Sequence, residues 1–380
     1  MSRIWLSSPH MGEKEKFYVE EAFQTNWVAP LGPNVDIFEK QLSDYVGVKG
    51  AVSLSSGTAA LHLALLSLGV AKNDVVICQS FTFAASAFPI SYCGAEPVFV
   101  DSEEETWNMD PLLLKKALTD QKEKGKKVKA IIVVHLYGMP AKMDEILSIA
   151  NDFGVSVIED AAEALGSRYN NTACGSMGEV SILSFNGNKI ITTSGGGALV
   201  SNNSETLQFA RHVSAQAKEP APYYLHHQIG YNYRMSNICA GIGRGQMEVL
   251  PQRIEARRSH FEKYKNNLGT ISGISFPDEP VGFFSNRWLT TMVLDERVYK
   301  SGSVEIIRQA LEKKNIETRP LWKPLHQQPV FADCQMYLNG VSDKLFEHGI
   351  CLPSGSNMNE ETLVMVIEEI KQVLKQLKTD

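Results

Sequence analysis

Short apolar runs separated by helical patterns occupy the chain from about residue 13 to residue 250. The run AIIVV at residues 130–134 does not alternate polar with apolar positions, so both faces of that strand are expected to be buried. Strands that alternate with helices predict an α/β fold, in which helices flank a mostly parallel, seven-stranded sheet. The predicted strands, each bounded by turn residues, are residues 51–54, 74–79, 96–101, 130–135, 155–159, 180–185 and 198–200.

Capping residues support helices between these strands. Asp110 followed by Pro111 is typical of a helix N-terminus, because the aspartate accepts hydrogen bonds from free backbone N–H groups and proline needs no acceptor. Gly69 is expected to close a helix whose leucines share one face. His62, on that apolar helix, is expected to be a core histidine.

The pattern changes beyond about residue 251. A long charged helix, a strand-like run and a helix at residues 303–314 precede a last helix, in which leucines and isoleucines recur at helical spacing. We therefore predict a large domain, residues 1–250, and a smaller α+β C-terminal domain, residues 251–380.

Composition mainly excludes classes of protein. The 380 residues are 43% hydrophobic and 21% charged, which is ordinary for a globular protein. The formal net charge of -6 argues against binding of nucleic acid by bulk charge. No signal-peptide core and no apolar stretch of about 18 residues is present, which predicts a soluble, cytoplasmic protein without a membrane partner. The six cysteines are scattered, so we expect reduced thiols and no metal site.

The first segment with chemical potential is AVSLSSGTAALHLAL, residues 51–65. A strand, a turn of small residues and a helix follow one another there, which leaves free N–H groups at a helix N-terminus for an anion. Ser55, Ser56 and Thr58 add hydroxyl donors. The segment matches neither a P-loop nor a dinucleotide fingerprint, and alone it is equally consistent with simple helix capping.

Two further segments contain an acid and an amine. Asp160 follows a buried strand, where ligands of doubly wound sheets bind, although it is also a plausible cap for the next turn. Lys189 lies between two apolar strands, and a partly buried lysine can be nucleophilic, although an exposed loop lysine is the commoner case. Together, an anion cradle, an acid and an amine are the groups that hold pyridoxal phosphate. Phe83 is available to stack on its ring.

Six motifs in order resemble a known family. SGTAALHLAL, SFTFAAS, HLYG, IEDAAEALGS, SFNGNK and GYNYRMSN are similar to the DegT/DnrJ/StrS family of sugar-nucleotide aminotransferases, within the fold-type I aspartate aminotransferase superfamily. The likeness extends from about residue 5 to residue 375. It implies a fold-type I pyridoxal phosphate enzyme that transfers amino groups.

The resemblance implies roles for single residues. Lys189 would form the Schiff base and shuttle the proton, and Asp160 would pair with the pyridine nitrogen. Glu163 would approach the phenolic oxygen of the cofactor, where many relatives carry Gln or His. The other cofactor-binding positions that it implies are Thr58, Ala59 and Ser184 at the phosphate, Phe83 over the ring, and Gly57.

Two departures from the common family pattern indicate the substrate. Residues 192–197 read TTSGGG, with no glutamate at Gly195, and SSPHMG stands near the N-terminus. With ETRPLWKPLH and CLPSGS, these variants resemble bacillosamine-pathway aminotransferases. The resemblance implies that L-glutamate aminates a UDP-linked 4-keto-6-deoxy-N-acetylglucosamine at C4. Another nucleotide sugar (dTDP or GDP), or a non-catalytic cofactor-binding regulator, remains as an alternative, whereas Lys189 argues against a dehydratase.

Contacts beyond the cofactor are expected from two sources. Asn232, in GYNYRMSN, would reach the phosphate of the neighbouring subunit, so the resemblance implies a homodimer with shared active sites. An anionic UDP-sugar on an acidic protein requires local cations and apolar walls. The candidate substrate-binding residues are Trp27, Arg234, Arg319, Trp322 and His326. The glycines of GIGRG, residues 241–245, are assigned to close helix packing and not to a nucleotide.

Overall fold

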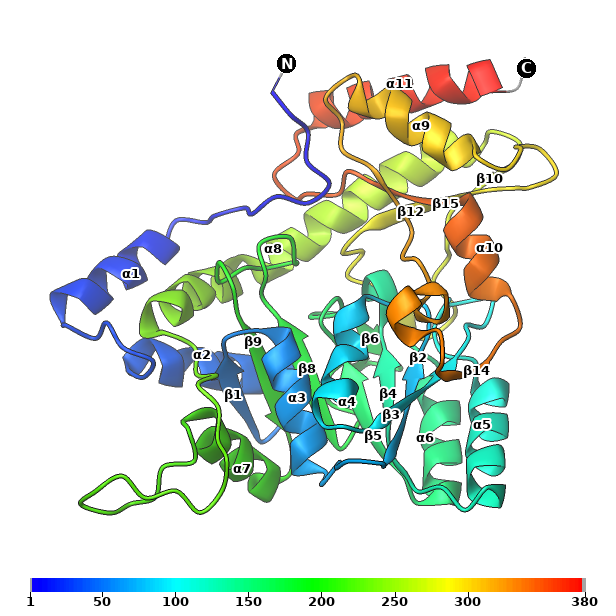
Figure 1. Ribbon diagram of the computed structural model, residues 1–380. Helices are drawn as coiled ribbons and strands as arrows, with labels where there is room; N and C mark the ends of the chain where they lie inside the picture. The colour runs from blue at the N-terminus through cyan, green and yellow to red at the C-terminus, as the bar shows by residue number, and fades with distance from the viewer. Residues whose placement is uncertain (1, 378–380) are drawn as a thin grey trace.

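The computed structural model describes residues 2–377. Its largest feature is an eight-stranded sheet with the strand order β1-β9-β8-β5-β4-β2-β3-β14 (Figure 1). Neighbouring strands are parallel, except that β9 is antiparallel to both β1 and β8. The strands are β1 (Gly50–Leu54), β9 (Gly197–Ser201), β8 (Val180–Ser184), β5 (Ser156–Asp160), β4 (Val128–Val134), β2 (Val75–Gln79), β3 (Glu96–Val100) and β14 (Gln335–Tyr337).

All seven predicted strands are confirmed, and the sequence missed the eighth. β14 comes from the C-terminal part of the chain and pairs with the edge strand β3, with Met336 opposite Phe99. Three residues are too few to show a periodicity, so this strand is not recognisable in the sequence. The predicted seven-stranded sheet therefore has one additional edge strand.

Helices cover both faces of the sheet, as the α/β prediction requires. α3, α4 and α7 pack on one face, whereas α2 and α8 pack on the other face near β9, and α5 and α6 near β3. Strands buried on both sides explain the continuous apolar runs. The bounds are α2 (Pro33–Val46), α3 (Gly57–Ser67), α4 (Phe88–Tyr92), α5 (Pro111–Glu123), α6 (Met143–Phe153), α7 (Ser204–Ser214) and α8 (Asn237–Leu268).

The predicted helix signals are confirmed. Asp110 Oδ1 accepts a hydrogen bond from the Leu112 N–H at 2.8 Å, at the start of α5. Gly69 lies just beyond α3 with φ 69°, a left-handed conformation that glycine adopts without strain. His62 is 4% exposed and packs against aromatic rings, so it is a core histidine.

The long charged helix begins earlier than the sequence predicted. α8 runs without interruption through Pro251 and extends from the large sheet to the C-terminal elements (Figure 1). The GIGRG glycines lie in its first half, against α1 (Glu15–Gln24) and α2. A Cβ on Gly245 would stand 2.6 Å from the backbone nitrogen of Glu15, and one on Gly243 would stand 2.7 Å from the Phe38 ring. The helix-packing interpretation is confirmed.

The C-terminal elements surround a second, antiparallel sheet, β10-β12-β15-β13. The apolar stripe of the last helix is buried against it, together with the C-terminal half of α8. The division at residue 250 stays a prediction, and α8 crosses it. The elements are β10 (Ile274–Ser275), β12 (Thr290–Leu294), β15 (Gly349–Leu352), β13 (Arg319–Pro320), α9 (Ser303–Glu312), α10 (Val341–His348) and α11 (Glu360–Leu377).

An arm of residues 215–236, between α7 and α8, projects from the molecule at the lower left of Figure 1. Within residues 2–377, no helix is both long and apolar enough to cross a bilayer. The remaining short elements are β6 (Arg168–Tyr169), β7 (Thr172–Ala173), β11 (Phe283–Phe284), and the 3-10 helices η1 (Ala84–Ser86), η2 (Leu136–Gly138), η3 (Leu325–Gln327) and η4 (Pro329–Phe331).

Candidate active site

A cavity of about 440 Å³ lies at the carboxyl ends of the central parallel strands. This is the edge at which open α/β sheets bind ligands, because the connecting loops diverge there. The cavity brings together segments that are far apart in the sequence. Nine residues that the sequence predicted line it: Gly57, Thr58, Phe83, Asp160, Glu163, Ser184, Lys189, Arg319 and Trp322.

One wall of the cavity is the N-terminus of α3. Ser56 caps this helix, with its Oγ accepting from the Ala59 N–H at 3.0 Å. Gly57 and Thr58 occupy the first turn and line the cavity, where N–H groups have no carbonyl partner within the helix. A Cβ on Gly197 would stand 2.4 Å from the Gly57 nitrogen, so only a glycine on β9 permits the turn to approach so closely. The wall suits an anion.

Asp160, the last residue of β5, lies at the base of the cavity. Its side chain is 6% exposed. One carboxylate oxygen accepts from the Ser86 hydroxyl at 2.7 Å, and the other accepts from the Ala162 N–H at 3.2 Å. Ser86 Oγ is in turn 2.9 Å from Thr82 Oγ1. These bonds fix a buried carboxylate that retains capacity for a cationic or N–H partner.

Lys189 reaches the same cavity from the connection between β8 and β9. Its Nζ is 3.6 Å from Glu163 Oε1 and 4.1 Å from the centre of the Trp288 ring. Glu163 also accepts from the Tyr137 N–H at 2.7 Å. Burial raises the pKa of the Glu163 carboxyl, and the Lys189 ammonium opposes this rise only in part. A buried amine and two acids therefore meet in one space.

Several residues at the cavity or beside it had no role predicted from the sequence, although Ser86 and Tyr137 lie within the motifs SFTFAAS and HLYG. Ser86 follows Phe83 in a 3-10 turn, and Trp288 belongs to the segment that the sequence indicated only as part of the second domain. Tyr137 has φ 53°, an unusual conformation for a non-glycine residue that turns its N–H toward Glu163. Its ring stacks on Trp322 at 6.2 Å, and Trp322 also lies 5.3 Å from Phe83. Only the folded chain brings these rings together.

A second cavity, of about 350 Å³, adjoins the first and shares four of its lining residues. The N-terminal segment from Trp5 to Pro9 supplies much of its wall. Arg319 lies between the two cavities, with its guanidinium 2.7 Å from Glu317 Oε1. The shared residues are Asn188, Trp288, Arg319 and Trp322.

Five predicted residues line neither cavity: Ala59, Trp27, Asn232, Arg234 and His326. Arg234 Nη1 is 3.2 Å from Glu39 Oε1, and burial lowers the pKa of the guanidinium. The ring of His326 is held between Ser80 Oγ, at 2.7 Å, and an oxygen of Asp343, at 2.8 Å. Trp27 and Asn232 are exposed on the surface.

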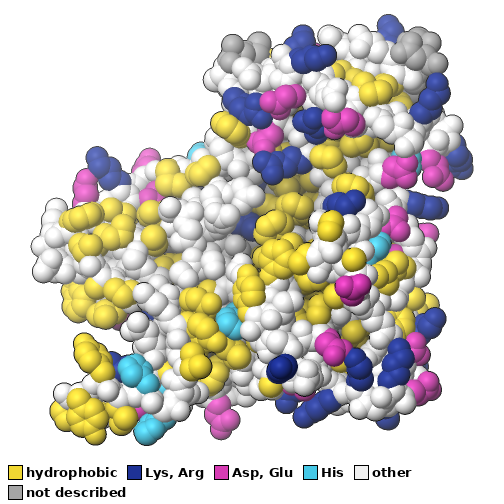
Figure 2. Space-filling view, viewed as in Figure 1, with side chains coloured by type: hydrophobic (Ala, Val, Ile, Leu, Met, Phe, Trp, Pro, Cys, Tyr) yellow, Lys and Arg dark blue, Asp and Glu magenta, His cyan; other side chains and the backbone are white. Residues whose placement is uncertain are grey.

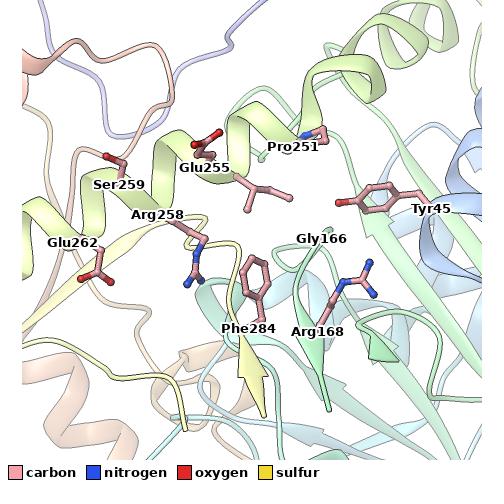
Figure 3. Close-up of a pocket in the computed structure, with 10 residues that line it drawn as sticks. Tyr45, Gly166, Arg168, Pro251, Glu255, Arg258, Ser259, Glu262 and Phe284 are labelled. Carbon is pink, nitrogen blue, oxygen red and sulfur yellow. The ribbon is translucent and has the colours of Figure 1, made fainter. Parts of the chain in front are cut away.

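A larger cavity, of about 580 Å³, lies beside α8 near Pro251 (Figure 3). It is lined by Tyr45, Ile254 and Phe284 among others, and none of the predicted site residues reaches it. The Arg258 guanidinium on this wall is already paired with Glu279. Among residues 2–377, no group of three or more His, Cys, Asp or Glu side chains is arranged to hold a metal ion. The 440 Å³ cavity is therefore the candidate active site.

Comparisons with known proteins agree with this site. Residues 9–371 match the DegT/DnrJ/EryC1/StrS aminotransferase family. The chain is 54% identical to the Bacillus subtilis (strain 168) protein named "Putative pyridoxal phosphate-dependent aminotransferase EpsN", over 96% of this chain and 94% of the relative. It is 36% identical to the GDP-perosamine synthase of Escherichia coli O157:H7, over 98% and 99%. The PLP-form structure of "Putative sugar aminotransferase Spr1654" from Streptococcus pneumoniae matches with a TM-score of 0.90 and 26% identity, over 99% of each chain.

The fold and the site define a pyridoxal phosphate-dependent transaminase. The chain belongs to the DegT/DnrJ/EryC1/StrS aminotransferase family and is a sugar aminotransferase. The family, the α/β fold and the cofactor that the sequence motifs implied are thereby confirmed. The roles of single residues stay predictions.

The 440 Å³ cavity suits this cofactor in each of its chemical parts. The N-terminus of α3 offers free N–H groups to a phosphate, and the Asp160 carboxylate offers an acceptor to a protonated ring nitrogen. The Lys189 amine offers a nucleophile to an aldehyde. Phe83 and Ala162 line the space between them and can enclose a flat ring.

Proposed function

We propose that this sugar aminotransferase moves the amino group of L-glutamate to C4 of a UDP-linked 4-keto-6-deoxy sugar. The product would be UDP-4-amino-4,6-dideoxy-N-acetylglucosamine, formed from UDP-2-acetamido-2,6-dideoxy-4-hexulose. The observation that carries the proposal is the meeting of Lys189, Asp160 and the α3 N-terminus around one 440 Å³ cavity. A second cavity beside it provides space for a substrate.

Different residues of the site hold different parts of the cofactor. Gly57, Thr58 and Ser184 bind its phosphate, with the α3 dipole favouring the negative charge. Asp160, fixed by Ser86, keeps the ring nitrogen protonated. Pyridoxal phosphate, when bound, supplies the reactive aldehyde and an electron-withdrawing ring.

Lys189 moves the protons. Its Nζ takes the proton from the α-carbon of glutamate in the first half of the reaction and returns a proton to C4 of the sugar in the second. The Trp288 ring lies 4.1 Å from Nζ and bounds the cavity on that side. Burial raises the pKa of the Glu163 carboxyl, which lies 3.6 Å from Nζ at a position where many relatives carry Gln or His.

Substrate recognition rests on the second cavity. Arg319, between the two cavities, can attract a carboxylate or a diphosphate, and Glu317 beside it holds the guanidinium in place. Trp5, which the sequence did not indicate, and Trp322 offer flat walls. Arg234 and His326 line neither cavity, which argues against them as substrate-binding residues.

The choice of nucleotide rests on sequence motifs and on relatives. TTSGGG, SSPHMG, ETRPLWKPLH and CLPSGS support a UDP-sugar through their resemblance to bacillosamine-pathway enzymes. The similarity to GDP-perosamine synthase supports a GDP-sugar as the alternative. A cytoplasmic location also stays a prediction.

A homodimer with shared sites is part of the same proposal. Large apolar side chains are exposed on α1 and the following turn, and again on the arm, and they gather on the left of the view in Figure 2. Patches of this kind are typical of protein interfaces. Asn232 lies at the base of the arm, exposed and outside the cavities of its own chain. Those side chains are Phe17, Phe23, Trp27, Val28, Leu31, Tyr223, Tyr224 and Ile229.

A substrate panel tests the proposal. Purified protein with pyridoxal phosphate and glutamate receives UDP-, dTDP- and GDP-linked 4-keto sugars in turn, and 2-oxoglutarate release and NMR of the amino sugar are measured. We expect the UDP-sugar to be preferred and Lys189→Ala to abolish turnover with it. Equal catalytic efficiency for all three nucleotides would refute UDP recognition, and wild-type turnover by Lys189→Ala would refute the role of the lysine. Lys49→Ala, on the surface, is the matched control.

A further inference from the structure

Arg257, on α8, is a fully buried cation that the proposed reaction does not use. Arg257 is 1% exposed. Among the described residues no carboxylate is paired with it, and its Nε has no hydrogen-bond partner. Burial, with a smaller effect from the neighbouring Arg253, lowers the pKa of the guanidinium to about 9. An unpaired charge in the interior costs several kcal/mol, roughly, so a packing role alone does not account for it.

Both terminal nitrogens of this guanidinium are linked to the Asn188 carbonyl oxygen, each through one intervening residue. Nη1 donates to the Trp288 carbonyl at 2.5 Å, and Nη2 donates to Ser7 Oγ at 2.9 Å. Ser7 Oγ donates onward to the Asn188 carbonyl at 2.7 Å, and the Trp288 indole N–H donates to that same carbonyl, also at 2.7 Å. Arg257 thus secures both donors that hold the residue preceding Lys189.

This closed arrangement joins three distant parts of the chain. Ser7 comes from the N-terminal segment, Trp288 from the segment that leads into β12, and Arg257 from the middle of α8. Ser7 and Trp288 share one acceptor, the peptide carbonyl between Asn188 and Lys189, and Arg257 donates to both of these residues. Since a carbonyl held by two donors cannot rotate freely, the peptide plane that leads into Lys189 is fixed, and with it the backbone position from which the Lys189 side chain extends.

We propose that Arg257 is a positioning residue for Lys189: through Ser7 and Trp288 it holds the Asn188 carbonyl so that Nζ points at the aldehyde of the cofactor. The inference rests on the proposed role of Lys189. In the reaction concerned, Nζ forms a C–N bond with the aldehyde carbon, and the aldehyde oxygen leaves as water with the two amine protons. Orientation of Nζ controls the rate of this reaction, whereas the phosphate contacts control how tightly the cofactor is first bound.

Reconstitution of the cofactor-free protein separates these two quantities. Quenching of tryptophan fluorescence on addition of pyridoxal phosphate reports the first, non-covalent binding, and the visible absorbance band reports covalent attachment. For Arg257→Met we expect attachment to slow at least about tenfold at an unchanged binding constant, because a small misplacement of a reacting group is costly. Arg257→Lys keeps the charge but places all its donors on one nitrogen, which does not span both acceptors as the guanidinium fork does, so we expect it to lie between Arg257→Met and wild type.

Arg253→Met is the matched control. Arg253 lies one turn earlier on α8, is also buried, and donates to the carbonyls of His10 and Met11, not to the bonds around Asn188. Its loss should leave the attachment rate within about twofold of wild type. The thermal unfolding midpoint of each cofactor-free variant shows whether a merely structural defect is present, because such a defect would lower the midpoint without selecting the attachment step.

Ser7→Ala removes the middle of the bridge without touching the buried cation, so it tests the link even where Arg257→Met does not fold. Ser7→Ala should also lower the rate of covalent attachment. If both residues act through one link, the Ser7→Ala, Arg257→Lys double variant should attach the cofactor no more slowly than the slower of the two single variants. Wild-type attachment rates in Arg257→Met and Ser7→Ala, or equal slowing in Arg253→Met, would overturn the inference. Borohydride reduction and peptide mapping keep the two proposals separate: a cofactor fixed to a residue other than Lys189 contradicts the role of the lysine itself.

Discussion

Two adjacent acids on β5 have opposite environments, because successive side chains of a strand point to opposite faces. Asp160 faces the active-site cavity. Glu159 points to the other face, fully buried, where it accepts hydrogen bonds from His135 Nε2 at 2.9 Å and from the Gly175 N–H at 2.8 Å. The N–H groups of Met177 and Gly178 and the Ser181 hydroxyl also donate to it. The pair of acids therefore serves two purposes, and Glu159 anchors the strand end that presents Asp160.

The His135–Glu159 pair predicts a pH-dependent stability. Burial and the Ala141 N–H, which donates to Nδ1 at 3.0 Å, oppose the charged imidazole, but Cys174 and Glu159 raise the pKa of His135 to about 10. A raised pKa contributes stability that is complete below the unfolded value near 6.5 and is lost as the pH rises toward about 10. His135→Gln should therefore cost about 3–5 kcal/mol at about pH 6, as expected for one partner of a buried pair, and clearly less at about pH 9.

Thermal unfolding midpoints of wild type and variant across that range measure the difference. His62→Gln is the control, since burial lowers the pKa of His62, the opposite direction to the shift of His135. The difference in unfolding midpoint between His62→Gln and wild type should stay constant from about pH 6.5 to about pH 9. A His135→Gln deficit that is equally constant would show that His135 is neutral in the folded protein.

At the scale of elements, α8 supports the site although it does not line the cavity. Its first half packs through glycines against α1 and α2, and its second half presents Arg257 toward the peptide that precedes Lys189. A displacement of the first half would be transmitted along a continuous helix to that contact. The glycines therefore matter for more than local packing.

Gly245→Ala tests this packing. The new methyl group would stand 2.6 Å from the Glu15 nitrogen and 2.9 Å from its Cα, and backbone atoms cannot move aside as a flexible side chain can. Overpacking of this kind costs about 1–3 kcal/mol, which exceeds the gain of up to about 1 kcal/mol in helix propensity. The unfolding midpoint should fall, whereas Gln252→Ala, exposed on the same helix, should stay close to wild type. An unchanged or higher midpoint for Gly245→Ala would mean that α1 moves away freely.

At the scale of the whole molecule, the arm of residues 215–236 bears on whether a second chain completes the site. The arm carries Tyr224 and Ile229, which are 82% and 84% exposed, and Asn232 at its base is exposed and lines neither cavity of the site. Exposed apolar side chains of this size on an extended segment favour contact with a second copy.

Subunit complementation tests the shared site. Lys189→Ala and Asn232→Ala should each have little activity alone, but mixed dimers should regain activity, because one of their sites combines an intact Lys189 with an intact Asn232 from the other chain. The release of 2-oxoglutarate from glutamate measures the recovery. Lys189→Ala mixed with Asp160→Asn is the control without recovery, since both changes lie in the same chain's cavity. A mixture no more active than the mean of its parents would show that Asn232 serves no neighbouring site.

The sequence determined the framework of this protein. Periodicity predicted seven strands of the large sheet, and capping residues predicted helix ends, because burial and local hydrogen bonding act on neighbouring residues. Ordered motifs indicated the family, the cofactor and the residues Lys189, Asp160 and Phe83, which the fold brings to one cavity.

The tertiary structure decided what depends on contacts between distant segments. β14 completes the sheet only by pairing with β3, and the Glu159–His135 pair forms only when two strands lie side by side. Ser7 and Trp288 both donate to the Asn188 carbonyl and both accept from Arg257, although hundreds of positions separate Ser7 from the other two. No local pattern encodes such a meeting, because its free energy arises from burial and hydrogen bonds that exist only in the assembled chain.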